Sequence, residues 1–180
     1  MDAITCIKER RSIRNFEDKK VPREVIEQVV ETAAFAPSWK NTQIARYIVI
    51  EDQKLIETIA NDCVLGFESN AVAIKKAPAL VLVTMIKKRS GYERDGSFTT
   101  SKGDGWEMFD AGIAAQTFCL AAHEQGLGTV IMGIFDEAKV AEVVEIPEGQ
   151  QLAAMIPLGY PSEAPKAPKR KTVEDLLSYR

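Results

Sequence analysis

The side chains best suited to chemistry in this sequence are basic residues gathered near its two ends. Residues 8–23 contain seven Lys or Arg residues and residues 166–180 contain five, which together is about half of the 23 in the chain. The planar guanidinium of arginine can donate two parallel hydrogen bonds to a phosphate or a carboxylate. Two basic ends can be solvated tails, or they can converge on one anion such as a phosphate.

Other groups that commonly carry reactions are scarce. The only histidine is His123, and three cysteines, Cys6, Cys63 and Cys119, show no paired spacing. This composition disfavours a metal site and a nucleophile activated by histidine, so we predict no metal ligands. The odd, sparse cysteine count is typical of free thiols in a reducing cytoplasm. If the protein is an enzyme, a bound group rather than a side chain supplies the reactive atom.

Length and composition describe an ordinary globular protein. The chain has 180 residues, of which 46% are hydrophobic and 27% charged, so we expect one domain spanning residues 1–180. A net charge of −3 does not favour nucleic acid as a partner. The longest nearly pure apolar run, residues 77–86, is too short to cross a bilayer, and charges in the first twelve residues argue against a secretory signal. We therefore expect a cytoplasmic protein with neither a membrane nor a nucleic acid as partner.

The hydrophobic pattern alternates between helical and strand periods along the chain. Two helices come first, and strands then alternate with helices, which predicts a mixed α/β or α+β domain. No G-x-G-x-x-G or G-x-x-x-x-G-K-[ST] motif is present. Residues 87–105 are polar and aperiodic, and predict either a substrate lid or a disordered loop. Helices are predicted over 2–8, from Pro22 until Pro37, over 52–60, 68–75, 106–125, 136–144 and from 172, and strands over 45–50, 79–86, 128–132 and 151–158.

Four motifs in a fixed order give the sequence a family resemblance. They are Arg-Arg-Ser-Ile-Arg-Asn-Phe at 10–16, Ala-Pro-Ser-Trp-Lys-Asn-Thr-Gln at 36–43, a Gly-Leu-Gly-Thr stretch at 126–129 that leads to Met-Gly, and Ile-Pro-Leu-Gly-Tyr-Pro at 156–161 before the basic tail. Together they resemble the FMN-dependent nitroreductase family of NAD(P)H-dependent flavin oxidoreductases. The resemblance implies an α+β fold with a central, mostly antiparallel sheet flanked by helices. It also implies an intertwined homodimer that holds FMN at its interface.

The resemblance assigns expected roles to particular residues. The phosphate and ribityl end of FMN is expected to bind Arg10, Arg11, Ser12 and Arg14, closed by Lys169 or Arg170 of the tail. The remaining expected contacts are Pro37, Ser38, Asn41 and Gln43 of the partner subunit's loop, Asn70 near the pyrimidine edge of the flavin, and the backbone of Met132 and Gly133 near flavin N5. The family often has a lysine near this asparagine, where our alignment places Ala73, with Lys75 and Lys76 nearby but offset.

The function implied by the resemblance is transfer of hydride from NAD(P)H to a nitroaromatic, quinone or similar small-molecule acceptor in a ping-pong mechanism. No catalytic side chain is expected, because flavin N5 carries the hydride. The alternatives are a non-catalytic FMN carrier or regulator, and a flavin enzyme of the same fold with another reaction, such as a dehalogenase. A protein that binds another phosphorylated ligand is a third class.

Overall fold

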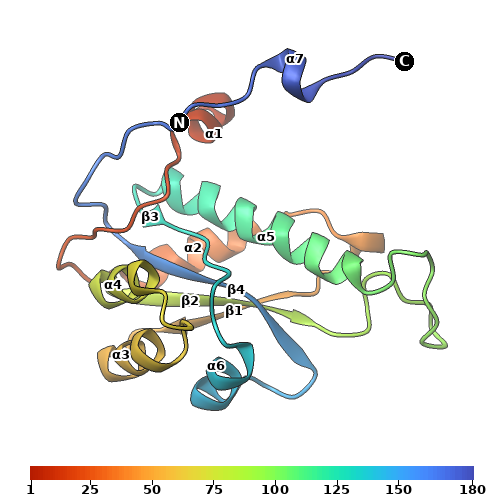
Figure 1. Cartoon of the computed structure of the whole chain (residues 1–180), viewed down its shortest axis with the longest axis horizontal. Coiled ribbons are helices and arrows are strands. Elements are labelled where there is room, and N and C mark those ends of the chain that lie inside the picture. Colours follow the sequence, from red (N-terminus) through yellow and green to blue (C-terminus); the bar gives the residue numbers. More distant parts are fainter.

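A four-stranded antiparallel sheet forms the centre of the protein in the computed structural model, which describes all residues 1–180 (Figure 1). The strands are β1 (Ala45–Ile50), β2 (Ala79–Ile86), β3 (Gly128–Thr129) and β4 (Gln150–Gly159), and their order in the sheet is β1-β2-β4-β3. Strand β1 is therefore one edge of the sheet and β3 the other. The expected α+β class with an antiparallel sheet is confirmed.

Helices cover both faces of this sheet. Helices α2 and α5 lie on one face, and α3, α4 and α6 lie on the other (Figure 1). A short 3-10 helix, η1, spans Trp39–Asn41. The helices are α1 (Ala3–Glu9), α2 (Arg23–Ala33), α3 (Gln53–Asp62), α4 (Glu68–Lys76), α5 (Gly105–Glu124), α6 (Glu137–Val144) and α7 (Val173–Leu176).

The apolar run of β2 follows from this two-sided burial. Val81 and Val83 pack into the core beneath α2 and α5, whereas Leu80 and Leu82 pack into the core beneath α3, α4 and α6. All four side chains are completely buried. A strand covered on both faces has no solvent-facing positions, so its sequence shows no polar alternation.

Strand β3 is shorter than the predicted strand over 128–132. The ladder with β4 stops after Thr129, and Met132 then pairs with Met155 as an isolated bridge. The same register would place Val130 opposite Pro157, and a proline has no N–H to donate. Pro157 on β4 therefore accounts for the interruption, which the apolar run over 128–132 does not indicate by itself.

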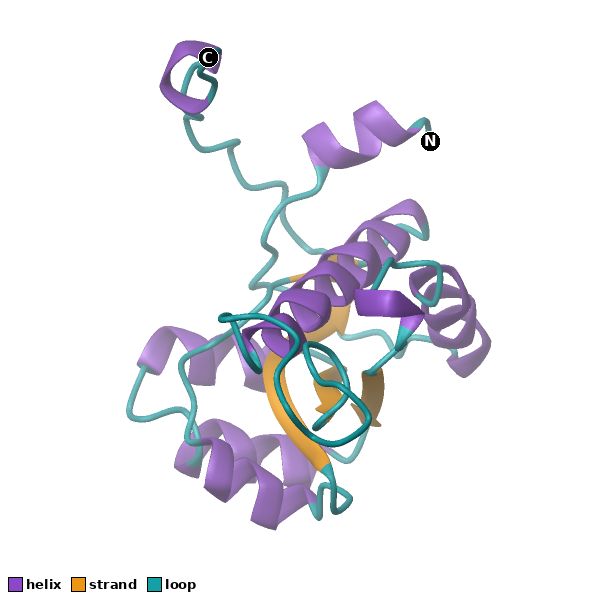
Figure 2. Cartoon of the chain, turned by 90° about the vertical axis from the view of Figure 1, so that its right-hand side faces the viewer, coloured by secondary structure: helices purple, strands orange, loops and turns teal.

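Two segments without regular structure complete the molecule. Residues 87–104 form a loop with defined contacts, including a bridge between Tyr92 and Phe98 and a 2.9 Å hydrogen bond from Trp106 Nε1 to Thr100 Oγ1. The C-terminal tail and α1 both project from the body on the same side (Figure 2). None of the helices combines the length and apolar character that crossing a membrane requires.

Candidate functional site

The arginine-rich segment after α1 lies along the free edge of β3. Ser12 forms a parallel bridge with Thr129, in which Ile13 N–H donates to the Thr129 carbonyl at 2.9 Å. A Cβ at Gly128 would come within 2.8 Å of the Ile13 side chain. The glycine is therefore required for this close approach, which fixes the backbone of the segment against the sheet.

The arginines of this segment form no ion pair with a carboxylate of the chain. Arg10, Arg11 and Arg14 take part in none of the three ion pairs of the structure. The nearby carboxylate of Glu163 instead accepts from Asn15 Nδ2 at 2.8 Å and from the Arg14 backbone N–H at 3.4 Å. The Asn15 hydrogen bond is the main reason that the Glu163 pKa lies below its usual value. Guanidinium groups held in place without a carboxylate partner form a site for an anionic ligand.

A cavity of about 420 Å³ opens beside these arginines. Its lining includes Arg10, Arg11, His123 and the Gly126–Thr129 turn, together with Glu9 and Glu163. His123 Nε2 is buried and has no hydrogen-bond partner. Burial, followed by the positive charge of Arg10, holds the His123 pKa below its usual value. The cavity thus combines two arginines that form no ion pair, two carboxylates and one hydrogen-bonding atom without a partner.

Asn70 and the residues after β3 lie together on the same side of the sheet. Asn70 is buried on α4, and its Nδ2 donates to the Ile134 carbonyl at 3.4 Å. The Met132 side chain is in the core, and its N–H already donates to the Met155 carbonyl at 2.8 Å. Gly133 N–H makes no hydrogen bond, and the space at its Cα is open. Of the two predicted backbone donors, Gly133 is therefore the free one.

The predicted partner loop lies at the opposite end of α5 from the arginines. Its Trp39 N–H donates to the Asp110 carboxylate near the start of α5, whereas His123 of the arginine cavity is near the end of that helix. At a rise of about 1.5 Å per residue, these two positions are ~20 Å apart along the helix axis. A single chain therefore does not bring Ser38, Asn41 and Gln43 to the arginine segment (Figure 1).

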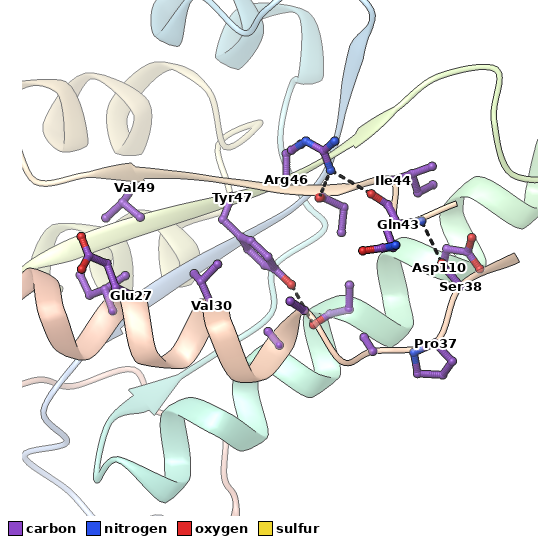
Figure 3. Close-up of a pocket in the computed structure, with 16 residues that line it drawn as sticks. Glu27, Val30, Pro37, Ser38, Gln43, Ile44, Arg46, Tyr47, Val49 and Asp110 are labelled. Atoms are coloured by element: carbon purple, nitrogen blue, oxygen red, sulfur yellow. Dashed lines mark hydrogen bonds between the residues drawn. The ribbon is translucent and has the colours of Figure 1, made fainter. Parts of the chain in front are cut away.

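Pro37, Ser38 and Gln43 belong instead to a second pocket, of about 530 Å³, between α2, β1 and α5. Figure 3 shows Ser38, Gln43 and Asp110 at one end of this pocket, with Tyr47 in the middle. Burial raises the pKa of Tyr47 to about 12, and its hydroxyl donates to the Ala114 carbonyl at 3.4 Å. Sequence reasoning missed this pocket, although the weak polar and apolar alternation of residues 45–50 is typical of an edge strand.

The two tail residues expected to close the anion site are not joined to it. Lys169 and Arg170 are exposed, and neither forms an ion pair. The Arg170 guanidinium donates only to the Pro168 carbonyl, at 3.2 Å. Lys76 of the offset lysine pair contacts Asn15 Oδ1 at 2.5 Å, while Ala73 is in the core. Lys76, one helical turn beyond Ala73 on α4, therefore contacts the arginine segment.

Comparison with known proteins shows to which protein family this chain belongs. Residues 7–73 and 67–160 match the model of the nitroreductase family. A protein of Methanothermobacter thermautotrophicus, provisionally named NADH dehydrogenase/NAD(P)H nitroreductase, is 32% identical over 169 residues, which are 92% of this chain and 80% of that protein. The chain belongs to the nitroreductase family of oxidoreductases.

Two further relatives show the range of this similarity. The iodotyrosine deiodinase of Thermotoga neapolitana is 28% identical over 187 residues, which cover 92% of both chains. The solved structure of an FMN-dependent nitroreductase from Clostridium difficile R20291 is 27% identical and superposes with a TM-score of 0.74, covering 92% of this chain and 91% of that one.

Proposed function

We propose that the protein is an FMN-dependent oxidoreductase that transfers hydride from NAD(P)H to a small-molecule acceptor, such as a nitroaromatic or a quinone. The observation that carries the proposal is the arginine segment, which is fixed against β3 with its three guanidinium groups free of carboxylates. The similarity to an FMN-dependent nitroreductase and to a relative named for NAD(P)H supports it.

The donor groups present fit this cofactor. Arg10 and Arg11 line a cavity that can accept a phosphate, with Ser12 and Arg14 next along the same backbone segment. Gly133 N–H has no other partner, and Asn70 lies close to the same stretch of chain. When bound, FMN supplies the hydride chemistry that no side chain of this protein offers. The chain binds and orients the cofactor, and a free N–H directed at the ring would favour its reduced form.

A complete site requires a second copy of the chain in this proposal. The arginine segment and the 37–43 loop lie at opposite ends of α5, so an antiparallel pair of α5 helices brings the loop of one copy to the arginines of the other. One face of α5 suits such contact, because Phe109 is 58% exposed and nothing lies within 4 Å of a Cβ built at Gly112. The half-buried Ile113 and Leu120 continue the same face. The glycine allows two helices to approach closely.

A second candidate reaction is reductive dehalogenation with the same cofactor. It is favoured by the deiodinase of Thermotoga neapolitana, which matches this chain over 92% of both lengths. The two reactions use the same cofactor site and differ in the acceptor that binds above it. A carrier or regulator that holds FMN without turnover is the remaining alternative.

The experiment begins with the visible spectrum of the purified protein, with and without added FMN. NADH and then NADPH are added without oxygen, followed by menadione, a nitrofuran and 3-iodotyrosine as acceptors. We expect bound flavin that bleaches with a nicotinamide and recovers with an acceptor, and release of iodide would identify the dehalogenase reaction. Flavin that resists both nicotinamides would support the carrier. A colourless protein that takes up no FMN would overturn the proposal.

A further inference from the structure

The loop predicted to contact the flavin has an unusual backbone. Lys40, Asn41 and Gln43 have φ angles of 44°, 56° and 49°, so three of four consecutive residues are left-handed without being glycine. Asparagine adopts this conformation readily, but lysine and glutamine pay a steric cost for it. Such conformations persist only where the surrounding structure holds them, and they are common at ligand sites.

The group that holds this loop is the carboxylate of Asp110. Asp110 is 4% exposed on α5, and its two oxygens accept the Trp39 N–H at 3.1 and 2.9 Å. Its Oδ2 also accepts the hydroxyl of Ser90 at 2.5 Å. Hydrogen bonds to a charged acceptor are stronger than neutral ones, and more so in a buried environment.

The directions of these hydrogen bonds connect a second point of the loop to the same carboxylate. Ser90 is fully buried, and its hydroxyl oxygen lies 2.7 Å from Thr42 Oγ1. Because a carboxylate only accepts, the single proton of Ser90 is directed to Asp110, and Thr42 must then donate to Ser90. The chain Thr42 to Ser90 to Asp110 therefore fixes the end of the loop, while the Trp39 N–H fixes its beginning.

We propose that Asp110, acting directly on Trp39 and through Ser90 on Thr42, is the positioning residue that sets the 38–43 loop for the flavin. The inference rests on the proposed function, because it names what places one half of that FMN site. It also gives residues 87–104 a role. Ser90 belongs to that segment, and Glu93 of the same segment forms an ion pair with Lys40 at 3.2 Å. The segment therefore supports the 38–43 loop.

The test uses three variants that weaken the hydrogen bonds between the loop and Asp110, and one control. Asp110→Asn keeps the shape but removes the charge and replaces one acceptor oxygen with an NH2 group that can only donate. Ser90→Ala removes the relay, and Thr42→Val removes its first donor. Thr58→Val is the control, because it also removes a hydroxyl that bonds within the chain, to the Lys54 carbonyl on the exposed face of α3.

The dissociation constant of FMN is measured at 10 °C by flavin fluorescence, together with the melting temperature of each apoprotein. We expect Asp110→Asn to raise the dissociation constant by about tenfold or more, with smaller increases for Ser90→Ala and Thr42→Val and none for Thr58→Val. Saturating FMN should restore kcat in each variant. A lower melting temperature with an unchanged dissociation constant would show a merely structural role and overturn the inference.

Amide hydrogen exchange of the apoprotein tests the contact between Asp110 and Trp39 without FMN, and FMN binding by the wild type separates the inference from the proposed function. The Trp39 N–H should exchange faster in Asp110→Asn than in the wild type, while the N–H of Val83 in the core strand stays protected. A wild type that binds no FMN would overturn the proposed function and the positioning role with it, even if Trp39 exchange behaves as expected. A wild type that binds FMN, with variants that bind it equally well, would overturn the inference alone.

Discussion

The two halves of the proposed site are held in opposite ways. The arginine segment is fixed by backbone pairing with β3, and its guanidinium groups form no ion pair with a carboxylate. The 38–43 loop is fixed by a buried carboxylate, and its backbone is strained. A segment that binds an anion through its side chains needs a fixed backbone and side chains without carboxylate partners. A loop with a strained backbone needs other groups to hold its conformation. Different mutations should therefore disrupt the two halves of the site.

The largest expected effect comes from keeping the two halves apart. Gly112→Arg places a long cation on the open face of α5, where a single chain has room for a Cβ. We expect the variant to fold, to sediment as a monomer and to lose FMN, because each site takes one half from each copy. The control is Glu142→Arg, which adds the same side chain at an exposed position of α6 on the other face of the sheet. A Gly112→Arg dimer that still binds FMN would contradict the proposed interface.

Removing one arginine should have the next largest effect. Arg10→Ala deletes a charge-assisted contact to the phosphate while leaving the bridge between Ser12 and Thr129 intact. A loss of roughly 10- to 100-fold in FMN affinity is expected, with little change in melting temperature. Arg23→Ala is the matched control, because that arginine is exposed and paired with Glu51 at 2.7 Å. Equal FMN affinity in the two variants would remove Arg10 from the site.

Arg14→Ala tests a second arginine of the same segment. The Arg14 side chain makes one hydrogen bond, to the Ser12 carbonyl at 3.5 Å, so its loss should leave the fold unchanged and weaken FMN binding. The effect should be smaller than that of Arg10→Ala, since Arg10 lines the anion cavity and Arg14 does not. Titration of both apoproteins with FMN tests the order. A larger effect at Arg14 would place the phosphate further along the segment.

The smallest expected effect is a pH dependence through His123. In the apoprotein the His123 pKa is below its usual value because of burial and Arg10. A lowered pKa in the folded state means that stability is present above the unfolded value of about 6.5 and declines as pH falls below it. A bound phosphate would offset the charge of Arg10 and raise the pKa. NMR titration of this single histidine with and without FMN measures the shift directly, and no upward shift would place the phosphate elsewhere.

Most of the fold could be predicted from the sequence, because its signals are local. Apolar residues with a helical period and the unbroken apolar run of β2 reflect burial, so the helices and long strands lie where they were expected. The prediction for the end of β3 was wrong because that end depends on Pro157 of β4. The register places Pro157 opposite Val130 only in the folded sheet. The placement of the basic residues left solvated tails and an anion site as alternatives, and the resemblance of the motifs assigned the arginines to a phosphate.

The residues that hold the 38–43 loop in place could not be predicted in the same way. Asp110 is one acidic residue in a helix, and nothing local indicates that it faces Trp39, which is 71 positions away in the sequence. Ser90 belonged to a segment that we expected to be either a lid or disordered, yet it is fully buried. The expected contact of Lys169 or Arg170 with the arginine segment also depends on how the tail is placed, and it stays a prediction.

The claim that one flavin site is shared between two copies is tested most directly by subunit mixing. Arg10→Ala damages one half of the site and Asp110→Asn damages the other, so each homodimer alone should bind FMN weakly. After subunits exchange, each mixed dimer has one site with both halves intact, and random pairing should restore tight FMN binding at about a quarter of all sites. Restoration of that fraction is the predicted result. No recovery on mixing, with exchange of subunits verified, would contradict a shared site.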